Sequence, residues 1–376
     1  MFGNSWRVGR IAGVEIRVDT SWAVVALLIT YSFYLRFSVI YRHFSGGTWA
    51  ALAILGSILF FGSVLTHEMA HALMSKARKI RVQDITLHLF GGATRAKVES
   101  KGPADEFLIA VVGPLTSIAL GVVFWVIAVA GKASPDRPVP GIFGYLGWLN
   151  LILAVFNLVP GFPLDGGRLL RSALWKLTGS LPRATRIASI AGQGFGWLLI
   201  AGGVFSLLQG SVSGGIWLAA IGWFLVQAAR ASYQELQVRL VLERAEAEDV
   251  MSRDLVPMPP DITLREAVDG YFMRLDHGAF PVEEDGRTVG LLTLRAVKRV
   301  PADEWNVRRV RESMKSLEDQ LIVSPHTRMD EVVAKLEDGP GRVLVAQDGE
   351  VIGMITPWDV ARWLQRWRAL EAPQRV

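Results

Sequence analysis

The sequence predicts a polytopic α-helical membrane protein with six transmembrane helices, followed by an α/β module of two tandem units. Of its 376 residues, 51% are hydrophobic and only 20% are charged, whereas about 25% is usual in soluble proteins. Residues 1–230 hold 20 Lys and Arg but 9 Asp and Glu, and residues 231–376 hold 20 and 26. This contrast predicts a membrane domain joined to a soluble one. A weak internal repeat predicts that the soluble part has two units.

Six apolar stretches each approach the ~20 residues that a helix needs to cross the hydrocarbon core. They cover residues 20–35, 49–74, 107–130, 145–164, 190–208 and 214–230. The second and fourth loops hold seven and five Lys and Arg, whereas the first, third and fifth hold two, two and none. By the positive-inside rule, the chain crosses the cell membrane six times, with both termini cytoplasmic. Residues 231–248, rich in Arg, Glu and Ala, predict a helical linker after the last span.

Composition excludes several classes of site. There are no cysteines, so neither a disulfide framework nor a thiolate metal site is possible. The net charge of +5 arises from membrane loops rather than from one basic face, so we expect no nucleic-acid partner. A phosphate-binding glycine loop and the Gly-x-Ser-x-Gly nucleophile motif are absent from the sequence.

The second apolar stretch ends in a pattern of metal-ligating residues. His67, Glu68 and His71 follow the charge-free run 50–66. Residues four apart lie on one face of a helix, so both imidazoles can reach one metal ion while Glu68 flanks it. Ionisable side chains within a membrane are costly, which indicates a functional site. The alternative is a pair of interfacial histidines near the lipid headgroups.

A third ligand is needed, because a catalytic zinc usually has three protein ligands and one position for water. Asp165 is the candidate, since it follows the fourth stretch at the same end of the membrane as the histidines. Prolines interrupt that stretch, and irregular backbone at this depth is tolerated only against protein or a water-filled cavity. Alternatively, Asp165 is only the N-cap of a helix that begins at Gly166. Asn157, about two turns earlier, either hydrogen-bonds a substrate carbonyl or bridges helices.

These residues predict hydrolysis of a peptide bond within the membrane. One Zn2+ per chain, held by His67, His71 and Asp165, would acidify a water molecule and polarise the scissile carbonyl. Glu68 would take the proton of that water and return it to the leaving amine.

Over about residues 1–230, the chain resembles the site-2 protease family of intramembrane zinc metalloproteases. The motifs that carry the resemblance are His67-Glu68-x-x-His71, Leu89-Phe90-Gly91-Gly92, Gly113-Pro114 and Asn157-x-x-Pro160-x-x-Pro163-x-Asp165-Gly166-Gly167. It implies that His67, His71 and Asp165 bind zinc and that Glu68 is catalytic. It also implies that the substrate is a transmembrane segment of another membrane protein, usually cut after a first, extracytoplasmic cleavage. Ser117 is a departure, because the family commonly has Asn there.

Residues 85–94 alternate in polarity like a strand. In the arrangement that the resemblance implies, Gly91 and Gly92 belong to an edge that positions an extended substrate by strand pairing. The alternative is a re-entrant loop that only packs.

The residues after 230 repeat weakly with a period of 63 residues. Each unit ends in a strand, an Asp-Gly turn, a second strand and a helix. This pattern resembles a tandem pair of CBS domains, with the first repeat at residues 249–309 and the second at 310–376. The resemblance implies association with a second copy through these domains.

The CBS resemblance also implies binding of an adenosine nucleotide, such as ATP or AMP. Thr356 and Asp359 match the family's nucleotide-contacting pair. The first repeat has Thr293 but Ala296 at the Asp position, so we expect at most one nucleotide site. The alternative is a purely structural dimerisation module.

Two other functions fit parts of the pattern. A CBS-regulated transporter or channel would have six spans and the repeats, but its ionisable groups would follow a path across the membrane, whereas here they cluster at one end. A catalytically silent relative would only bind membrane proteins, but all three ligands and the base are intact.

Overall fold

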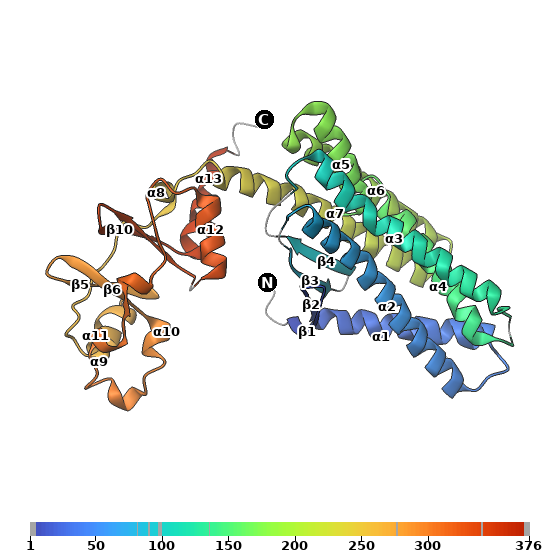
Figure 1. The fold of residues 1–376 in the computed structure, drawn as a ribbon, viewed down its shortest axis with the longest axis horizontal. Coiled ribbons are helices and arrows are strands. Elements are labelled where there is room, and N and C mark those ends of the chain that lie inside the picture. The colour runs from blue at the N-terminus through green and yellow to red at the C-terminus, as the bar shows by residue number, and fades with distance from the viewer. Residues whose placement is uncertain are drawn as a thin grey trace. The chain divides into compact units, whose positions relative to one another are not determined.

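The computed structural model describes residues 5–80, 82–88, 91–96, 100–134, 136–275, 277–339 and 341–371. The chain forms two compact units, Met1–Leu236 and Gln237–Val376 (Figure 1). Within the described residues, six helices are long and apolar enough to cross a membrane, and strands and shorter helices form the second unit. The predicted fold class is therefore confirmed.

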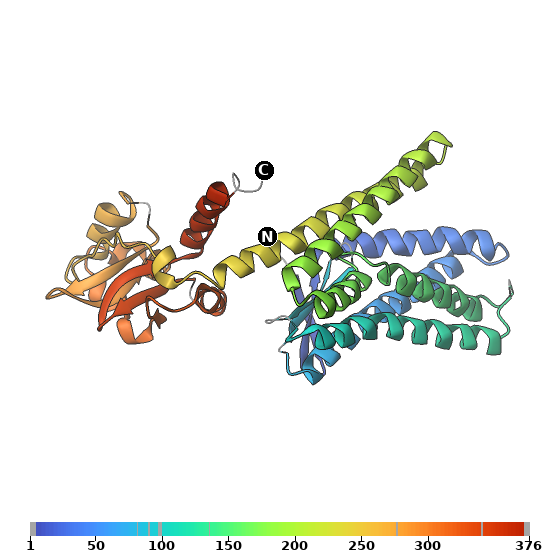
Figure 2. The ribbon, with the colours of Figure 1, turned by 90° about the horizontal axis from the view of Figure 1, so that it is seen from above.

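The six apolar helices follow the predicted order. They are α1 (Thr20–Ile40), α2 (Gly46–Ala77), α3 (Pro103–Ala130), α4 (Pro138–Asn157), α6 (Leu181–Leu208) and α7 (Val212–Leu242). A shorter helix, α5 (Asp165–Thr178), lies between α4 and α6. Helices α6 and α7 form a long hairpin (Figure 2). Helix α3 packs against α2, α4 and α5, so it lies between the two helices that carry the candidate ligands.

The fourth apolar helix departs from its predicted bounds. It begins at Pro138, whose fixed φ suits a first helical turn, and it ends at Asn157 rather than at residue 164. Pro160 and Pro163, the latter after a cis peptide bond, disfavour helix at the residues that precede them. Residues 158–164 are therefore irregular, and α5 starts at Asp165.

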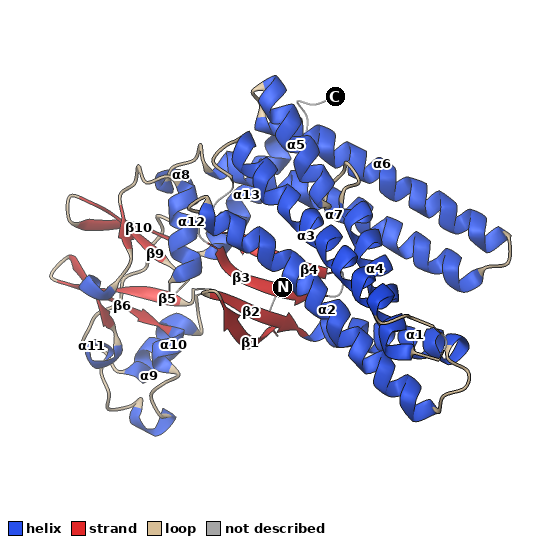
Figure 3. Ribbon diagram, turned by 45° about the vertical axis from the view of Figure 1, so that its right-hand side comes forward, coloured by secondary structure: helices blue, strands red, loops and turns tan. Residues whose placement is uncertain are grey.

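A four-stranded sheet of order β1-β2-β3-β4 accompanies these helices (Figure 3). Its strands are β1 (Ser5–Ile11), β2 (Val14–Asp19), β3 (Val82–His88) and β4 (Gly91–Ala96). Strand β2 pairs with β1 in antiparallel and with β3 in parallel orientation. Val14 and Ile16 of β2 are buried against Met69 and Ala72 of α2. The sheet therefore covers the end of α2 that carries the histidines.

The sheet also corrects one prediction. The single strand predicted over residues 85–94 is wrong, because this segment belongs to the antiparallel pair β3 and β4. Both arms of a hairpin alternate in polarity, so alternation alone does not reveal a reversal. Strands β1 and β2, which lie within residues 1–19, are additional to the elements that the sequence predicts.

The second unit holds two similar three-stranded sheets. The strands are β5 (Ala279–Glu284), β6 (Arg287–Thr293) and β7 (Lys315–Ser316), and then β8 (Ile322–Val323), β9 (Val343–Gln347) and β10 (Glu350–Ile355). The helices are α8 (Ala247–Val250), α9 (Leu264–Ala267), α10 (Leu294–Val297), α11 (Val310–Ser313), α12 (Met329–Asp338) and α13 (Pro357–Glu371). Single turns of other helix types cover Val268–Phe272, Ala302–Glu304 and Leu317–Asp319.

The two repeats have the same turn and share a core. The Asp-Gly pairs at 285–286 and 348–349 have positive φ at both residues, which is the geometry of the two-residue hairpin turn. Leu291 of β6 and Leu344 of β9 are buried in one cluster. The α/β pair that the sequence predicts is therefore joined through apolar contacts between the strands.

Candidate metal centre

Two histidines of α2 form one side of a buried site. His67 and His71 lie one helical turn apart on the same face. Each is only 4% exposed, and their Nε2 atoms lie 3.2 Å apart. Both rings therefore point into the protein rather than toward lipid headgroups, which argues against the interfacial alternative.

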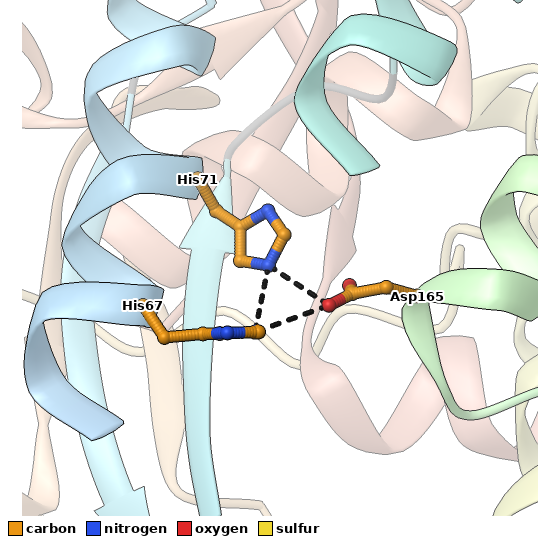
Figure 4. A group of neighbouring side chains, drawn as sticks. All are labelled: His67, His71 and Asp165. Atoms are coloured by element: carbon orange, nitrogen blue, oxygen red, sulfur yellow. Dashed lines mark hydrogen bonds and ion pairs between the residues drawn. The ribbon is translucent and has the colours of Figure 1, made fainter. Parts of the chain in front are cut away.

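Asp165 supplies the third side chain of the site. Its Oδ2 atom lies 3.1 Å from Nε2 of His67 and 3.1 Å from Nε2 of His71 (Figure 4). Asp165 is the first residue of α5, and the N-cap of that helix is Leu164. The alternative in which Asp165 only caps a helix is therefore wrong, because its carboxylate contacts the histidines.

Helix α3 holds the opposite nitrogen of each ring. Nδ1 of His67 lies 2.8 Å from Oγ of Ser117, and Nδ1 of His71 lies 2.6 Å from the backbone oxygen of Ile109. Because a carbonyl only accepts, Nδ1 of His71 carries a proton, which leaves Nε2 of the neutral ring as the lone-pair atom. Such outer partners orient ligating histidines and fix their tautomers. Ser117, where the resembled family commonly has Asn, therefore still holds His67.

Gly113 of α3 leaves room beside the two converging histidine nitrogens. A Cβ atom there would lie 2.2 Å from Nε2 of His71 and 2.7 Å from Nε2 of His67. The three ligand atoms lie within 4.8 Å of one another, and all three residues are buried. Two imidazoles and a carboxylate form a common ligand set for catalytic zinc. The residues present therefore fit one Zn2+.

Two glycines after Asp165 allow the chain to pack closely. A Cβ on Gly166 would lie 2.3 Å from backbone oxygens of the segment 158–159. A Cβ on Gly167 would lie 2.4 Å from backbone atoms of the segment 161–162. Only glycine permits such an approach between backbones. The Asp-Gly-Gly sequence therefore seats the start of α5 against the irregular segment before it.

The other predicted residues lie on the elements around this centre. Glu68 is half-buried and follows His67 on α2. Asn157 ends α4 and is half-buried, and its side chain makes no hydrogen bond to another described residue. Gly91 and Gly92 begin β4, an edge strand of the sheet that packs against α2. Leu89 and Phe90, which precede them, lie outside the described residues.

Sequence reasoning missed most of the contribution of α3. It identifies Gly113 and Ser117 as parts of a resemblance, but it does not single out Ile109. The positions 109, 113 and 117 share a helix face, which is a detectable signal. The partner of His71 is the backbone carbonyl of Ile109. Every residue type has such a carbonyl, so the sequence does not reveal it.

In the second unit, Thr356 and Asp359 form a closed hydrogen-bond network. Oδ2 of Asp359 accepts from the backbone N–H and the hydroxyl of Thr356, at 2.9 and 2.6 Å. Oδ1 of Asp359 accepts from Ser252 at 2.9 Å and from Arg362 at 2.8 Å. This reciprocal pattern is that of a capping box at the start of α13.

A half-buried cation lies at the same end of this repeat. Arg342 directly precedes β9, which pairs with β10, and Thr356 directly follows β10. Burial and the nearby Arg295 lower the pKa of the Arg342 guanidinium. Its Nη1 donates to the backbone oxygen of Gly278 at 3.4 Å, and its buried Nε has no partner among the described residues. Sequence reasoning missed this cation because no motif marks it.

A second cluster of possible metal ligands lies on the surface of this unit. Ligand atoms of Glu246, Glu248 and His326 lie within 4.8 Å of one another. Nδ1 of His326 lies 2.8 Å from Oε2 of Glu246, and this hydrogen bond raises the pKa of His326. Exposed ion pairs of this kind contribute little to stability.

Comparison with known proteins identifies the same two parts. The family model described as "Peptidase family M50" matches residues 55–139 and 126–201. The model described as "CBS domain" matches residues 247–303 and 310–366.

Two bacterial relatives, each named "Putative zinc metalloprotease", match nearly the whole chain. The protein sll0528 of Synechocystis sp. is 36% identical over 372 residues, which is 96% of each chain. Rip3 of Mycobacterium tuberculosis is 33% identical over 366 residues, which is 96% of this chain and 93% of that one. A solved site-2 protease from Methanocaldococcus jannaschii is 27% identical, covering 61% of this chain and 95% of that one with a TM-score of 0.43.

Proposed function

Because the chain belongs to the M50 (site-2 protease) family of zinc metalloproteases and carries a pair of CBS domains, we propose that it cleaves a transmembrane segment of another membrane protein. The observation that carries this proposal is the buried group His67, His71 and Asp165 at the end of a helix long and apolar enough to span a membrane. A cluster at one end suits hydrolysis better than transport, which requires polar groups along a path.

His67, His71 and Asp165 would hold the zinc ion, and Glu68 would handle the proton. When bound, zinc supplies Lewis acidity that acidifies a water molecule and polarises a carbonyl. A carboxylate oxygen of Glu68 accepts the proton of the attacking water as the new C–O bond forms. Glu68 then delivers that proton to the amide nitrogen as the C–N bond breaks. Ser117 and the Ile109 carbonyl keep both imidazoles oriented throughout.

The substrate segment must be extended before it is cut, because a helix hides its amides. Among the described strands β4 pairs only with β3, so its outer edge would suit strand addition. Gly91 and Gly92 would let the substrate backbone approach closely. The half-buried Asn157 has its amide available to a substrate carbonyl. We therefore assign substrate positioning to these three residues.

The proposal also covers the orientation of the chain in the membrane and the boundaries of its domains. The charge pattern of the loops supports cytoplasmic termini, and cleavage would follow a first cut on the opposite side. We propose the boundaries 1–230 for the protease domain, 231–248 for the linker, and 249–309 and 310–376 for the CBS repeats. Dimerisation through the CBS domains is part of this proposal.

We also propose that the CBS pair binds an adenosine nucleotide, ATP or AMP. Arg342 supports this, because it is a half-buried cation next to Arg295 and makes no ion pair within the described residues. Its guanidinium would meet the phosphates, while Thr356 and Asp359 would contact the ribose end. Since both oxygens of Asp359 are engaged, the ribose must displace Ser252 or Arg362.

Zinc content and cleavage test the catalytic assignment together. Purified wild type should hold about one zinc per chain, and Asp165→Ala should hold much less, whereas the control Asp136→Ala, at an exposed loop carboxylate, should match wild type. Glu68→Gln should keep its zinc but lose cleavage of single-span reporter proteins reconstituted with it in liposomes. Metal-replete wild type without zinc would refute the metal site, and unchanged cleavage by Glu68→Gln would refute the base.

Nucleotide binding is tested by titrating ATP and AMP calorimetrically into the full-length protein. Arg342→Gln should weaken binding of ATP about tenfold or more, since a charge-assisted contact contributes about 1.5–3 kcal/mol. Arg368→Gln, which removes an exposed cation of α13, serves as the control. Equal affinity of the two variants would remove Arg342 from the site, and no binding to wild type would favour the structural dimerisation module.

A further inference from the structure

One face of α3 contacts both histidines of the candidate metal centre. Glu106, Ile109, Gly113 and Ser117 are spaced by three, four and four residues, so they form a single stripe along the helix. Ile109 and Ser117 hold the two histidine rings, and Gly113 leaves space beside their Nε2 atoms. Glu106 is the first member of the stripe, and neither the fold nor the proposed chemistry has yet given it a role.

Glu106 forms a buried ion pair with Arg171 of α5. Nε of Arg171 donates to Oε1 of Glu106 at 2.6 Å, and Nη2 contacts the same oxygen. The Glu106 side chain is 0% exposed and that of Arg171 is 11% exposed. The guanidinium also stacks on the ring of Phe162, 5.1 Å from its centroid. Arg171 lies on the same short helix as Asp165, six residues further on.

Stability alone is a poor explanation for this pair. Removing two charges from water costs several kcal/mol per ion, and well-packed apolar residues of similar volume are often equally stable or more so. The best-attested use of a buried ion pair is to select one arrangement among several. Here the pair joins α3, which orients two ligands, to α5, which carries the third.

Two side-chain contacts join α5 to α3 and oppose a rotation of α5 about its own axis. Ser172 provides the first, because its Oγ donates to the backbone oxygen of Pro103 at 2.7 Å. Arg171 provides the second, about 100° around the helix. Without it, a rotation of roughly 20° would move a carboxylate ~5 Å from the helix axis by about 2 Å. Metal ligands tolerate only about 0.2 Å.

We propose that Glu106 and Arg171 are positioning residues, which hold Asp165 in register with His67 and His71 through α3. The pair touches neither the metal nor the substrate, and it acts through the orientation of α5. This inference rests on the proposed zinc site, and it extends that site to a connection between two helices.

The decisive variant replaces both charges, as Glu106→Leu with Arg171→Met. Because apolar side chains replace both charges of the pair together, the double variant should unfold within a few degrees of wild type. Its zinc affinity, measured by competition with a chelator, should nevertheless fall at least tenfold, and kcat should fall more than KM rises. Arg171→Lys keeps the charge but not the planar fork, so its zinc affinity should lie between those of wild type and the double variant.

A neighbouring ion pair provides the matched control. Arg78 bonds Asp105, one residue before Glu106, but the Arg78 side chain is 42% exposed. Arg78→Gln should leave zinc affinity unchanged. Wild-type zinc affinity in the double variant would overturn the positioning role, as would wild-type affinity in Arg171→Lys if the double variant does not fold. Absence of zinc from wild type would instead refute the zinc site itself, and this inference with it.

Discussion

Replacing Gly113 by alanine adds one carbon atom to the wall of the metal centre. The new Cβ would lie 2.2 Å from Nε2 of His71, 2.5 Å from its Cε1 and 2.7 Å from Nε2 of His67. Ordinary contact begins at 3.4 Å, so the His71 ring must retreat by about 1 Å. The ring cannot move freely, because its Nδ1 is bonded to α3 on the other side. The Nε2 atoms of the two imidazoles would therefore no longer converge on one metal position.

The expected effects on stability and on metal binding differ in size. Overpacking costs about 1–3 kcal/mol, but alanine in place of glycine favours a helix by about 1 kcal/mol. The free energy of unfolding should therefore change by no more than about 2 kcal/mol. Disturbing the groups that orient ligating histidines typically costs 10–100-fold in metal affinity. Because the Cβ also takes space beside the ligand atoms, we expect a loss at the upper end of that range or beyond.

The assay is zinc affinity of detergent-purified protein, measured by competition with chelators of graded strength, beside thermal unfolding followed by circular dichroism. Gly62→Ala on α2 is the control, since a Cβ there meets no atom within 4 Å, and it should bind zinc like wild type. If Gly113→Ala also binds zinc like wild type, the ligand atoms do not converge beside Gly113, and the reasoning is refuted.

Three further predictions follow from individual contacts. Ser117→Ala removes the hydroxyl 2.8 Å from Nδ1 of His67, so zinc affinity should fall about 10–100-fold in the same competition assay; unchanged affinity would show that Ser117 does not orient the ring. Asp359→Ala opens the cap of α13 and should cost about 1–2 kcal/mol in denaturant unfolding without nucleotide; no loss would contradict a structural role for that network. Glu246→Gln should return the raised pKa of His326 toward 6.5, as measured by NMR of histidine-labelled protein. Because the folded-state pKa is raised, the stability from this pair is present at low pH and is lost as pH rises through that pKa; an identical titration in the variant would rule out Glu246 as its cause.

The helical part of the fold was predictable because the signal for a membrane span is local. Each span needs only an uninterrupted apolar length, and α1 differs from its prediction mainly by continuing past Arg36 to Ile40. The sheet was not predictable in the same way. Strands β1 and β2 are short, and charged residues such as Arg7 and Glu15 lie within them. The pairing of β2 with β3 depends on a contact across about seventy residues of chain.

The metal ligands were predictable from the sequence. Most of the groups that surround and orient these ligands were not. The two histidines share a helix face, so local geometry brings them together. Asp165 could be placed because matching depth in the membrane narrows the choice of partners for buried histidines. The Ile109 carbonyl, the gap at Gly113 and the Glu106–Arg171 pair arise from how α3 packs against its neighbours. Such packing is not encoded in any short stretch of sequence.

The residues of the stripe on α3 must share one face of the helix. The number of residues between them therefore matters more than the identity of most other residues of α3. Deleting one residue between Ile109 and Gly113 would turn all that follows by about 100°, which would place Gly113 and Ser117 out of phase with Glu106. The side chains of Leu115 and Val122 are exposed and lie on the side of α3 opposite to Gly113. Among related proteins, α3 should therefore vary freely in its outward residues but accept neither insertions nor deletions between Glu106 and Ser117.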